Sequence, residues 1–185
     1  MARQYRIKRA ESPTEIEAAA RVVAAAVRES YEDLVSPQVF QILTGDELIV
    51  ARVEQWWRAT LDGAHLWLAQ HAQDGRTLAM AFADVSTEAD APTPLELKML
   101  FALEDVKGSG LADALLQTSI GDAPAHLWTF SGNDRAIGFY RKHGIGVICI
   151  GELVSTAWLG EFCRRFFGIR MVLYVHGEEI TTRFD

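Results

Sequence analysis

The first part of the chain begins with an alternation of apolar and polar residues and then changes to a helical spacing. Tyr5 to Arg9 alternates in this way, which predicts a short strand. Ser12 and Pro13 suit the cap and first position of a helix, and Glu15 can complete a capping box. Apolar residues then recur at helical spacing and define the buried face of this helix: Ile16, Ala20, Val23 and Val27.

The next segment is polar, and the pattern then changes from helices to strands. Tyr31 to Pro37 has the composition of a polar turn, and Val50 to Leu61 predicts a second helix. Asp74-Gly75 predicts a tight turn, and Thr87 to Pro94 predicts a polar loop. These connections separate three strand-like runs, and together they predict an antiparallel meander: His65 to His71, Leu78 to Ser86 and Leu95 to Leu103.

The last part of the chain alternates helices and strands. The expected elements are the helix Leu111 to Ser119, the strand His126 to Phe130, the helix Asn133 to His143, the strand Ile145 to Leu153 and the strand Arg170 to Val175. Ala157 to Phe167 is ambiguous between helix and loop. The order β-α-α-β-β-β-α-β-α-β-β predicts an α/β (α+β) protein with a mixed central sheet.

Composition supports a single acidic domain. The chain has 185 residues, and its 18 Lys and Arg against 25 Asp and Glu give a formal net charge of −7. This length suits one domain, and no linker interrupts the pattern, so residues 1–185 are predicted to form one domain. Nucleic acid is not an expected partner, because binding its phosphate backbone requires clustered Lys and Arg.

The cysteines and the apolar runs bear on the location of the protein. Cys149 and Cys163 both lie in apolar surroundings, which predicts reduced, buried thiols and a cytoplasmic location. No apolar run reaches the length of about 18 residues that a membrane-spanning helix needs, so a membrane is not an expected partner. The histidines do not have the spacing of metal ligands, and no metal site is predicted.

A strand followed by a glycine-rich turn and a helix is the first candidate site. Leu95 to Leu103 leads through Lys107-Gly108-Ser109-Gly110 into a helix that starts at Leu111. The first N–H groups of a helix lack partners within it and lie at the positive end of its dipole, so such a turn can bind phosphate. A plain turn that needs glycine for its geometry is the alternative. Neither the phosphate loop of triphosphatases nor the three-glycine dinucleotide motif is matched, since Asp113 replaces the third glycine.

A second segment, Asn133 to Ile145, makes the interpretation more specific. The two segments together resemble the GNAT superfamily of N-acetyltransferases, which use acetyl-coenzyme A. The family's first motif has Gln or Arg, then two residues, Gly, one residue, and Gly or Ala, and it corresponds to the stretch from Lys107 to Ala112. The second motif matches at these positions: Asn133, Ala136, Phe139, Tyr140, Lys142, Gly144 and Ile145. This chain departs from the family in Lys107, in Ser109 and in a longer segment from Glu152 to Gly168.

The resemblance implies a fold and a cofactor site. The fold would be a mixed, mostly antiparallel sheet flanked by helices on both faces. The backbone of Phe101, Ala102 and Leu103 would pair with the pantetheine arm of acetyl-CoA. Asn133 would bond this arm, and Ala136 would leave room for it. The N–H groups of the turn would hold the pyrophosphate: Lys107, Gly108, Ser109, Gly110, Leu111 and Ala112.

The resemblance also implies catalytic roles, each with a simpler alternative. Tyr140 would bind at the cofactor and protonate the departing thiolate, because a phenol with a pKa of about 10 keeps its proton at neutral pH. As an alternative, Tyr140 is an amphipathic ring on a helix face, and Asn133 is only a helix N-cap. Glu96 is the candidate general base, or else it forms a solvated pair with Lys98. The side chain of Phe101 is expected in the core, since it alternates with Met99 and Leu97.

The acceptor would be a small-molecule amine or a peptide N-terminus. Tyr31, Glu32 and Asp33 are the candidate substrate residues, because the family's substrate cleft borders the loop after the first helix; an exposed turn is the alternative. A catalytically silent acyl-CoA-binding sensor or assembly module is the second functional hypothesis. A dinucleotide-binding oxidoreductase is the third, and Asp113 argues against it. A homodimer would be formed if an edge strand near the C-terminus pairs with a second copy.

Overall fold

We analysed a computed structural model, which describes residues 5–89, 91–130, 133–148 and 168–173. The chain divides into two compact units, and the strands β3 (Thr77–Val85) and β4 (Leu95–Ala102) each contribute to both, with Asp84 and Val85 in the second unit. The first unit contains residues 1–83 and 99–121, and the second contains residues 84–98 and 122–185. The two units are described separately below, and the single domain that the sequence predicts stays a prediction.

The first unit starts with strand β1 (Tyr5–Arg9) and three helices. These helices are α1 (Pro13–Ser30), α2 (Pro37–Thr44) and α3 (Asp46–Leu61). Two strands follow, β2 (His65–His71) and β3 (Thr77–Val85), and the unit ends with the second half of β4, the short 3-10 helix η1 (Glu104–Val106) and the helix α4 (Leu111–Ile120).

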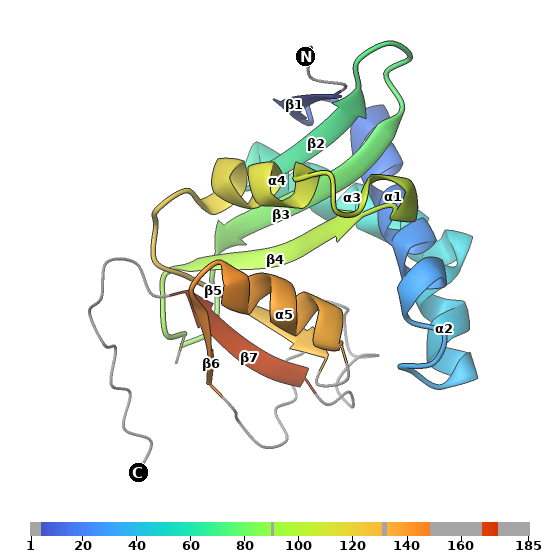
Figure 1. Ribbon diagram of the computed structural model, residues 1–185. Coiled ribbons are helices and arrows are strands. Elements are labelled where there is room, and N and C mark those ends of the chain that lie inside the picture. Colours follow the sequence, from blue (N-terminus) through green and yellow to red (C-terminus); the bar gives the residue numbers. More distant parts are fainter. Residues whose placement is uncertain (1–4, 90, 131–132, 149–167, 174–185) are drawn as a thin grey trace. The chain divides into compact units, whose positions relative to one another are not determined.

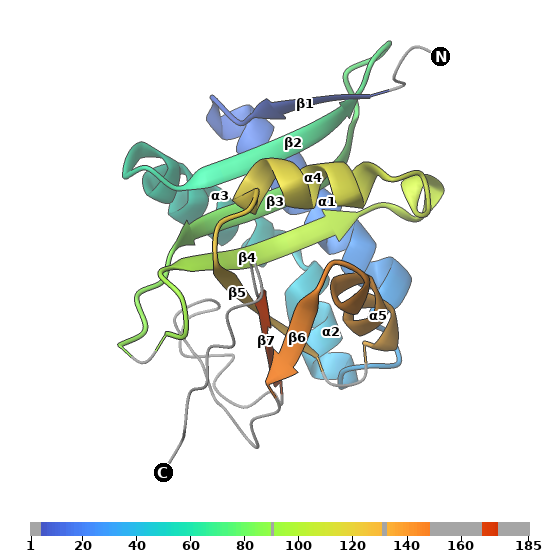
Figure 2. The same ribbon diagram turned by 60° about the vertical axis from the view of Figure 1, so that its left-hand side comes forward.

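The strands of the first unit form an antiparallel sheet. β1 pairs with β2 from Tyr5 opposite His71 to Arg9 opposite Trp67, and β2 pairs with β3. The end of β4 follows β3, where the Leu103 N–H donates to the Leu78 carbonyl at 3.0 Å. Figures 1 and 2 show α4 on one face of β2 and β3, with α1 and α3 on the other. Both faces are therefore covered, which explains why β3 is buried from Thr77 through Ala83.

The second unit combines parallel and antiparallel pairs. It contains the first half of β4, then β5 (Ala125–Phe130), α5 (Asp134–Lys142), β6 (Ile145–Ile148) and β7 (Gly168–Leu173). Its strand order is β4-β5-β7-β6. β4 runs parallel to β5, whereas β7 runs antiparallel to both β5 and β6. The predicted mixed, mostly antiparallel sheet is confirmed.

Most of the predicted elements are present, and the helix α2 and the short 3-10 helix η1 are unpredicted. We expected two helices between the first two strands, but Ser36 and Pro37 start an additional one. The Ser36 hydroxyl accepts from the Val39 N–H at 3.4 Å, and Pro37 occupies the first turn. Gly45 then ends α2 and precedes α3, which starts at Asp46 rather than at Val50.

Some predictions lie outside the described residues. These are the two cysteines Cys149 and Cys163, the ambiguous segment Ala157 to Phe167, and the end of the strand predicted from Ile145 to Leu153. The last described strand runs from Gly168 to Leu173, two residues earlier than the predicted Arg170 to Val175. Among the described helices, none combines the length and the apolar character needed to cross a membrane.

Candidate functional site

The glycine-rich turn before α4 has the backbone conformation that its two glycines suggest. Gly108 has a φ of 77° and Gly110 a φ of 81°, both in the left-handed region that favours glycine. A Cβ built on either residue meets no described atom within 4 Å. The turn therefore uses glycine for its conformation, and the space beside both glycines is open to a ligand.

The amide groups of this turn form a set of hydrogen-bond donors at the start of α4. In the described part of the chain, no acceptor takes the N–H groups of Gly108, Gly110 and Ala112. The Leu111 N–H donates to the Ser109 hydroxyl at 3.4 Å, and this hydroxyl donates to the Val106 carbonyl at 2.6 Å. The available N–H groups and the positive end of the helix dipole together favour a phosphate-like anion.

Side chains of α1 hold the segment that precedes the turn. The Lys107 ammonium donates to the Ser30 hydroxyl at 3.0 Å and to the Glu104 carboxylate. The Glu104 N–H donates to the Glu29 carboxylate at 2.9 Å. We predicted Lys107 as a cation beside the turn, and the structure shows that its charge is already paired with Glu104. The anion-binding character of this turn therefore depends mainly on backbone N–H groups.

A further ion pair fixes η1 from the β2–β3 turn. The Arg76 guanidinium donates to the Asp105 carboxylate at 2.8 Å, and this hydrogen bond raises the pKa of Arg76 above its usual value. Both side chains are more than half exposed, so the pair contributes little to stability. Its consequence is positional, because it ties η1 to the β2–β3 turn.

The end of β4 lies against the residue that follows α1. The Phe101 ring is half-buried, and its centroid is 6.2 Å from that of Tyr31. Phe101 is therefore not the fully buried core residue that its alternation with Met99 and Leu97 suggests. Tyr31 is only 9% exposed, so its ring packs inside the first unit rather than lying in an exposed turn.

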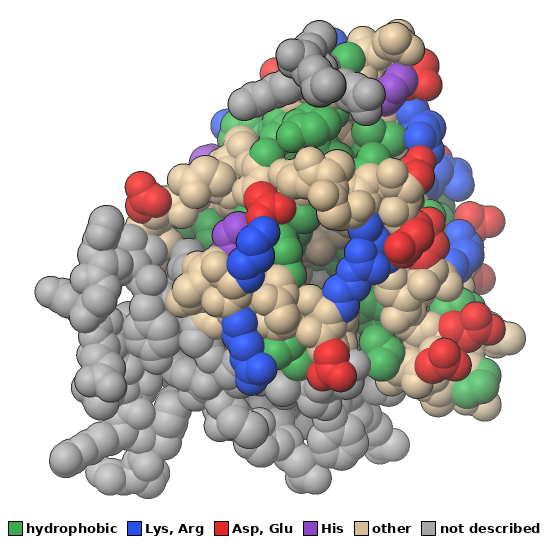
Figure 3. Space-filling model, viewed as in Figure 1, with side chains coloured by type: hydrophobic (Ala, Val, Ile, Leu, Met, Phe, Trp, Pro, Cys, Tyr) green, Lys and Arg blue, Asp and Glu red, His purple; other side chains and the backbone are tan. Residues whose placement is uncertain are grey.

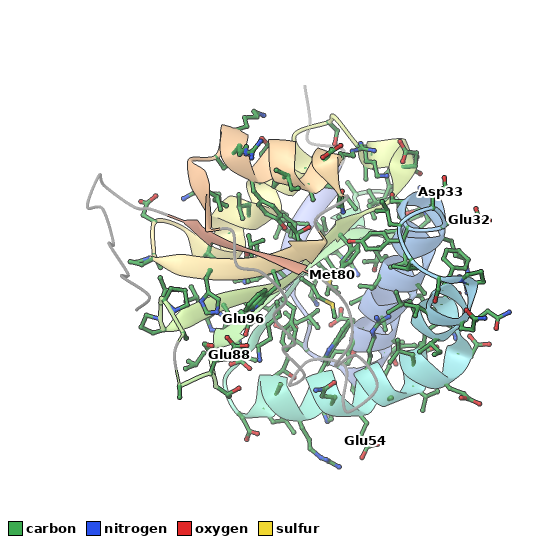
Figure 4. The ribbon with its side chains drawn as sticks, turned by 90° about the horizontal axis from the view of Figure 1, so that it is seen from below. Glu32, Asp33, Glu54, Met80, Glu88 and Glu96 are labelled. Atoms are coloured by element: carbon green, nitrogen blue, oxygen red, sulfur yellow. The ribbon has the colours of Figure 1, made fainter. Side chains whose placement is uncertain are left out.

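The other two candidate substrate residues differ from Tyr31. Glu32 and Asp33 are exposed, and Figure 4 shows both at the edge of the molecule. The segment from Tyr31 to Asp33 thus combines a packed aromatic ring with two solvated carboxylates. Glu32 and Asp33 therefore fit both alternatives that the sequence leaves open, a contact for a cationic amine and a surface turn, whereas Tyr31 does not fit the exposed turn.

Glu96 is buried on β4, and its neighbourhood differs from the predicted one. The Glu96 side chain is 8% exposed, which contradicts the solvated pair with Lys98 (Figure 4). Lys98 instead pairs with Asp84 of β3, with 3.3 Å between Nζ and Oδ2. The structure places Glu96 opposite His126 of β5, a residue that sequence reasoning treated only as a histidine without metal-ligand spacing. The position of His126 within an apolar strand was the signal in the sequence that could have indicated its burial.

Helix α5 carries the residues of the second motif. The Asn133 side chain accepts from the Ala136 N–H at 3.0 Å and thereby caps the helix, as the simpler alternative predicts. Tyr140 is 7% exposed, and its ring meets the edge of the Phe139 ring at 5.3 Å between centroids. This ring is therefore packed rather than exposed on a helix face.

The outer face of α5 is positively charged. Arg135, Arg141 and Lys142 are all exposed on this helix, and Figure 3 shows Lys and Arg side chains over it. Arg141 and Lys142 lie in the last turn, where cations interact favourably with the helix dipole.

The structure brings the candidate residues together in two groups. In the first unit, Phe101, Ala102 and Leu103 lead directly into the turn from Lys107 to Ala112, and Tyr31 packs on Phe101. In the second unit, α5 carries Asn133, Ala136 and Tyr140, and β4 carries Glu96. Each group is a local arrangement of backbone donors or side chains that can bind or exchange protons with a ligand.

Comparison with known proteins identifies the class of protein that these elements define. The family model of the acetyltransferase (GNAT) family matches residues 27–145, more than half of the chain, and this range includes both motifs. The chain belongs to the GNAT acetyltransferase family. No curated protein matches the sequence.

Solved structures share the fold at low sequence identity. The PaiA N-acetyltransferase from Thermoplasma acidophilum in complex with coenzyme A is similar, with 13% identity, a TM-score of 0.66, and coverage of 91% of this chain and 98% of that one. A GNAT-family acetyltransferase from Staphylococcus aureus has 15% identity, a TM-score of 0.61, and coverage of 91% and 98%. An acetyltransferase from Thermus thermophilus has 17% identity, a TM-score of 0.60, and coverage of 90% and 95%. These likenesses confirm the fold.

Proposed function

We propose that this protein is an N-acetyltransferase that moves an acetyl group from acetyl-CoA to a primary amine in a ternary complex. The observation that carries the proposal is the turn before α4, where Gly108 and Gly110 have positive φ and open space beside them. A diphosphate needs such open space together with converging N–H donors. Membership of an acetyltransferase family supports coenzyme A as the molecule that carries this diphosphate.

The residues present fit this cofactor. The N–H groups of Gly108, Gly110 and Ala112 would hold the diphosphate, with Ser109 and Leu111 keeping the turn in shape. The backbone of Phe101 to Leu103 would pair with the pantetheine arm. When bound, acetyl-CoA supplies an acetyl thioester that an amine can attack.

Tyr140 would act as the general acid. A phenol, whose reference pKa is about 10, holds its proton at neutral pH and can give it to a departing thiolate. The Tyr140 ring is buried and meets the edge of the Phe139 ring, which suits a group that must hold one position. The supporting observation is that Tyr140 is buried at the position where the family motif has its tyrosine.

Glu96 would act as the general base. A buried carboxylate holds a proton more readily than an exposed one, because burial disfavours its charged form. Such a group can take the proton of an amine directly or through one water molecule. The supporting observation is the burial of Glu96 on β4, the strand that continues into the candidate pantetheine segment.

The acceptor would be a small-molecule amine or a peptide N-terminus, met by the segment from Tyr31 to Asp33. The exposed carboxylates of Glu32 and Asp33 favour a cationic acceptor. We place the protein in the cytoplasm on the argument from its cysteines. A homodimer formed through β6, the edge strand of the second unit, belongs to the same proposal.

Binding and turnover test this proposal separately. Isothermal titration of the full-length protein with acetyl-CoA tests binding, and release of free thiol over a panel of amines tests transfer. We expect saturable binding and amine-dependent thiol release. Binding without turnover on any amine would favour the catalytically silent module, and the absence of both would contradict the cofactor assignment itself.

A further inference from the structure

Helix α5 has a glycine at the centre of its exposed face. Gly138 is exposed, and residues three and four positions away are its neighbours on the helix surface. These neighbours are all exposed as well: Asp134, Arg135, Arg141 and Lys142. Three cations and one carboxylate therefore surround a position that has no side chain.

In the part of the chain that the structure describes, nothing requires glycine at position 138. Gly138 lies inside α5 without a positive φ, and a Cβ built on it meets no described atom within 4 Å. Glycine makes a helix less stable than alanine does, and α5 has only nine residues. A glycine that the fold does not need and the helix does not favour is explained if another molecule approaches its backbone closely.

Helix stability alone does not explain the cations around Gly138. Arg141 and Lys142 lie in the last turn of α5, where the helix dipole favours cations, but Arg135 lies in the first turn, where the dipole disfavours them. Figure 3 shows Lys and Arg side chains over α5, on a protein whose formal net charge is −7. This helix face therefore attracts anionic groups locally, against the charge of the whole chain.

The chemistry of this face favours carboxylates as its ligands. The Asn133 side chain already accepts from the Ala136 N–H at 3.0 Å, so recognition depends on the exposed side chains rather than on the start of the helix. Guanidinium groups pair well with carboxylates, often through two parallel hydrogen bonds. Neighbouring positions on a helix lie about 5–6 Å apart, close to the spacing of about 7 Å between alternate side chains of an extended chain.

We propose that the exposed face of α5 around Gly138 is a docking site for a short acidic segment of a partner protein. The backbone of this segment would cross over Gly138. Its carboxylates would pair with Arg135 and Lys142 on one side of the glycine and with Arg141 on the other, where Asp134 also lies. Nucleic acid or an anionic membrane fits less well, because such an extended polyanion would repel the whole acidic protein. This inference goes beyond the proposed acetyl transfer, and its test needs no turnover.

Fluorescence anisotropy of the full-length protein with a labelled octaglutamate peptide tests the charge requirement. We expect saturable binding that weakens as salt is added, because exposed charges are screened. Arg135→Gln/Lys142→Gln should raise the Kd about tenfold. Arg21→Gln/Arg58→Gln is the matched control, since it removes two exposed cations from α1 and α3, and it should bind like the wild type. Absence of binding, or an equal loss in both double variants, would refute the docking site.

Gly138→Ala separates docking from helix stability. The added methyl group meets no described atom, so the higher helix propensity of alanine should raise the Tm by about 2–4 °C. The same methyl group would occupy the place where the acidic segment crosses, and the Kd for octaglutamate should rise about fivefold or more. Unchanged binding, or a loss of binding together with a loss of stability, would contradict the close approach.

Competition identifies the class of ligand. Octaglutamate should stay bound when coenzyme A is added, because the proposed diphosphate site is the turn before α4. Displacement by coenzyme A would assign the cations of α5 to the cofactor and overturn the proposal. A double-stranded DNA oligonucleotide, or vesicles of anionic lipid, would overturn it too if they bind more tightly than octaglutamate and depend on Arg135 and Lys142.

A single substitution keeps the decision independent of the double variant. If Arg135→Gln/Lys142→Gln fails to fold, Arg141→Gln removes the cation on the other side of Gly138 and should raise the Kd for octaglutamate about threefold. Binding of octaglutamate to Arg141→Gln with the wild-type Kd would then refute the proposal.

Discussion

Replacement of Gly110 by alanine tests the candidate anion site most directly. Gly110 has a φ of 81°, and an added Cβ would meet no described atom within 4 Å. The methyl group therefore clashes with nothing in the protein, and the structural cost is the strain of a left-handed alanine, about 1–2 kcal/mol. For a protein of this size that strain lowers the Tm by about 2–8 °C.

The effect on ligand binding should be larger than this strain implies. The open space that receives the methyl group is the space that a diphosphate would occupy. Loss of one hydrogen bond to a charged group costs about 1.5–3 kcal/mol, which corresponds to a Kd for coenzyme A that rises about 10- to 150-fold. Isothermal titration gives the Kd, and thermal denaturation followed by circular dichroism gives the Tm.

Gly75→Ala provides a matched control. Gly75 has a φ of 74° in the β2–β3 turn, and its added Cβ also meets nothing within 4 Å. The two variants should lose similar stability, whereas only Gly110→Ala should lose affinity for coenzyme A. If both variants bind coenzyme A like the wild type, the assignment of the diphosphate to this turn is wrong.

Three further predictions concern other parts of the molecule. Tyr140→Phe should lower kcat about 100-fold and leave the Kd for coenzyme A unchanged, since the ring still packs; rapid-mixing kinetics and titration check this, and a parallel loss of affinity would indicate a structural role. Asn133→Ala removes the acceptor of the Ala136 N–H and should lower the free energy of unfolding by about 1 kcal/mol. Asn133→Ser, which keeps a capping oxygen, should retain most of this free energy. Burial acts to raise the pKa of Glu15, but hydrogen bonds from Lys8 and a backbone N–H hold it below its usual value. The stabilisation from the Glu15 carboxylate is fully present above the pKa that Glu15 has in the unfolded chain, and it is lost as the pH falls through the lower pKa of the folded protein. The Tm of Glu15→Gln should therefore decline less than that of the wild type between about pH 5 and pH 3.

Local patterns predicted the elements that depend on residues close in sequence. The β2 strand from His65 to His71 and the turn at Gly75 follow from alternation and turn chemistry, and both were predicted with the correct positions. The same chemistry was present but overlooked at Ser36 and Pro37, which start α2 as Ser12 and Pro13 start α1.

Pairings between distant residues could not be predicted from the sequence. Glu96 and Lys98 share a strand face, which suggests a pair, but Lys98 is bonded to Asp84 instead. The burial of Glu96 beside His126 depends on the register of a parallel strand that joins the sheet 30 residues later. Local sequence carries no information on such a register, since it is determined by packing across the whole sheet.

The contacts between α1 and the segment before the turn have a consequence for the order of ligand binding. Glu29 and Ser30 hold Glu104 and Lys107, and the candidate acceptor residues start at the next position, Tyr31. A ligand that stiffens the turn would therefore also stiffen the last turn of α1 and preorganise the acceptor segment. For the proposed transferase, this linkage predicts that acetyl-CoA binds before the amine, and that product inhibition by free coenzyme A is competitive with acetyl-CoA and noncompetitive with the amine.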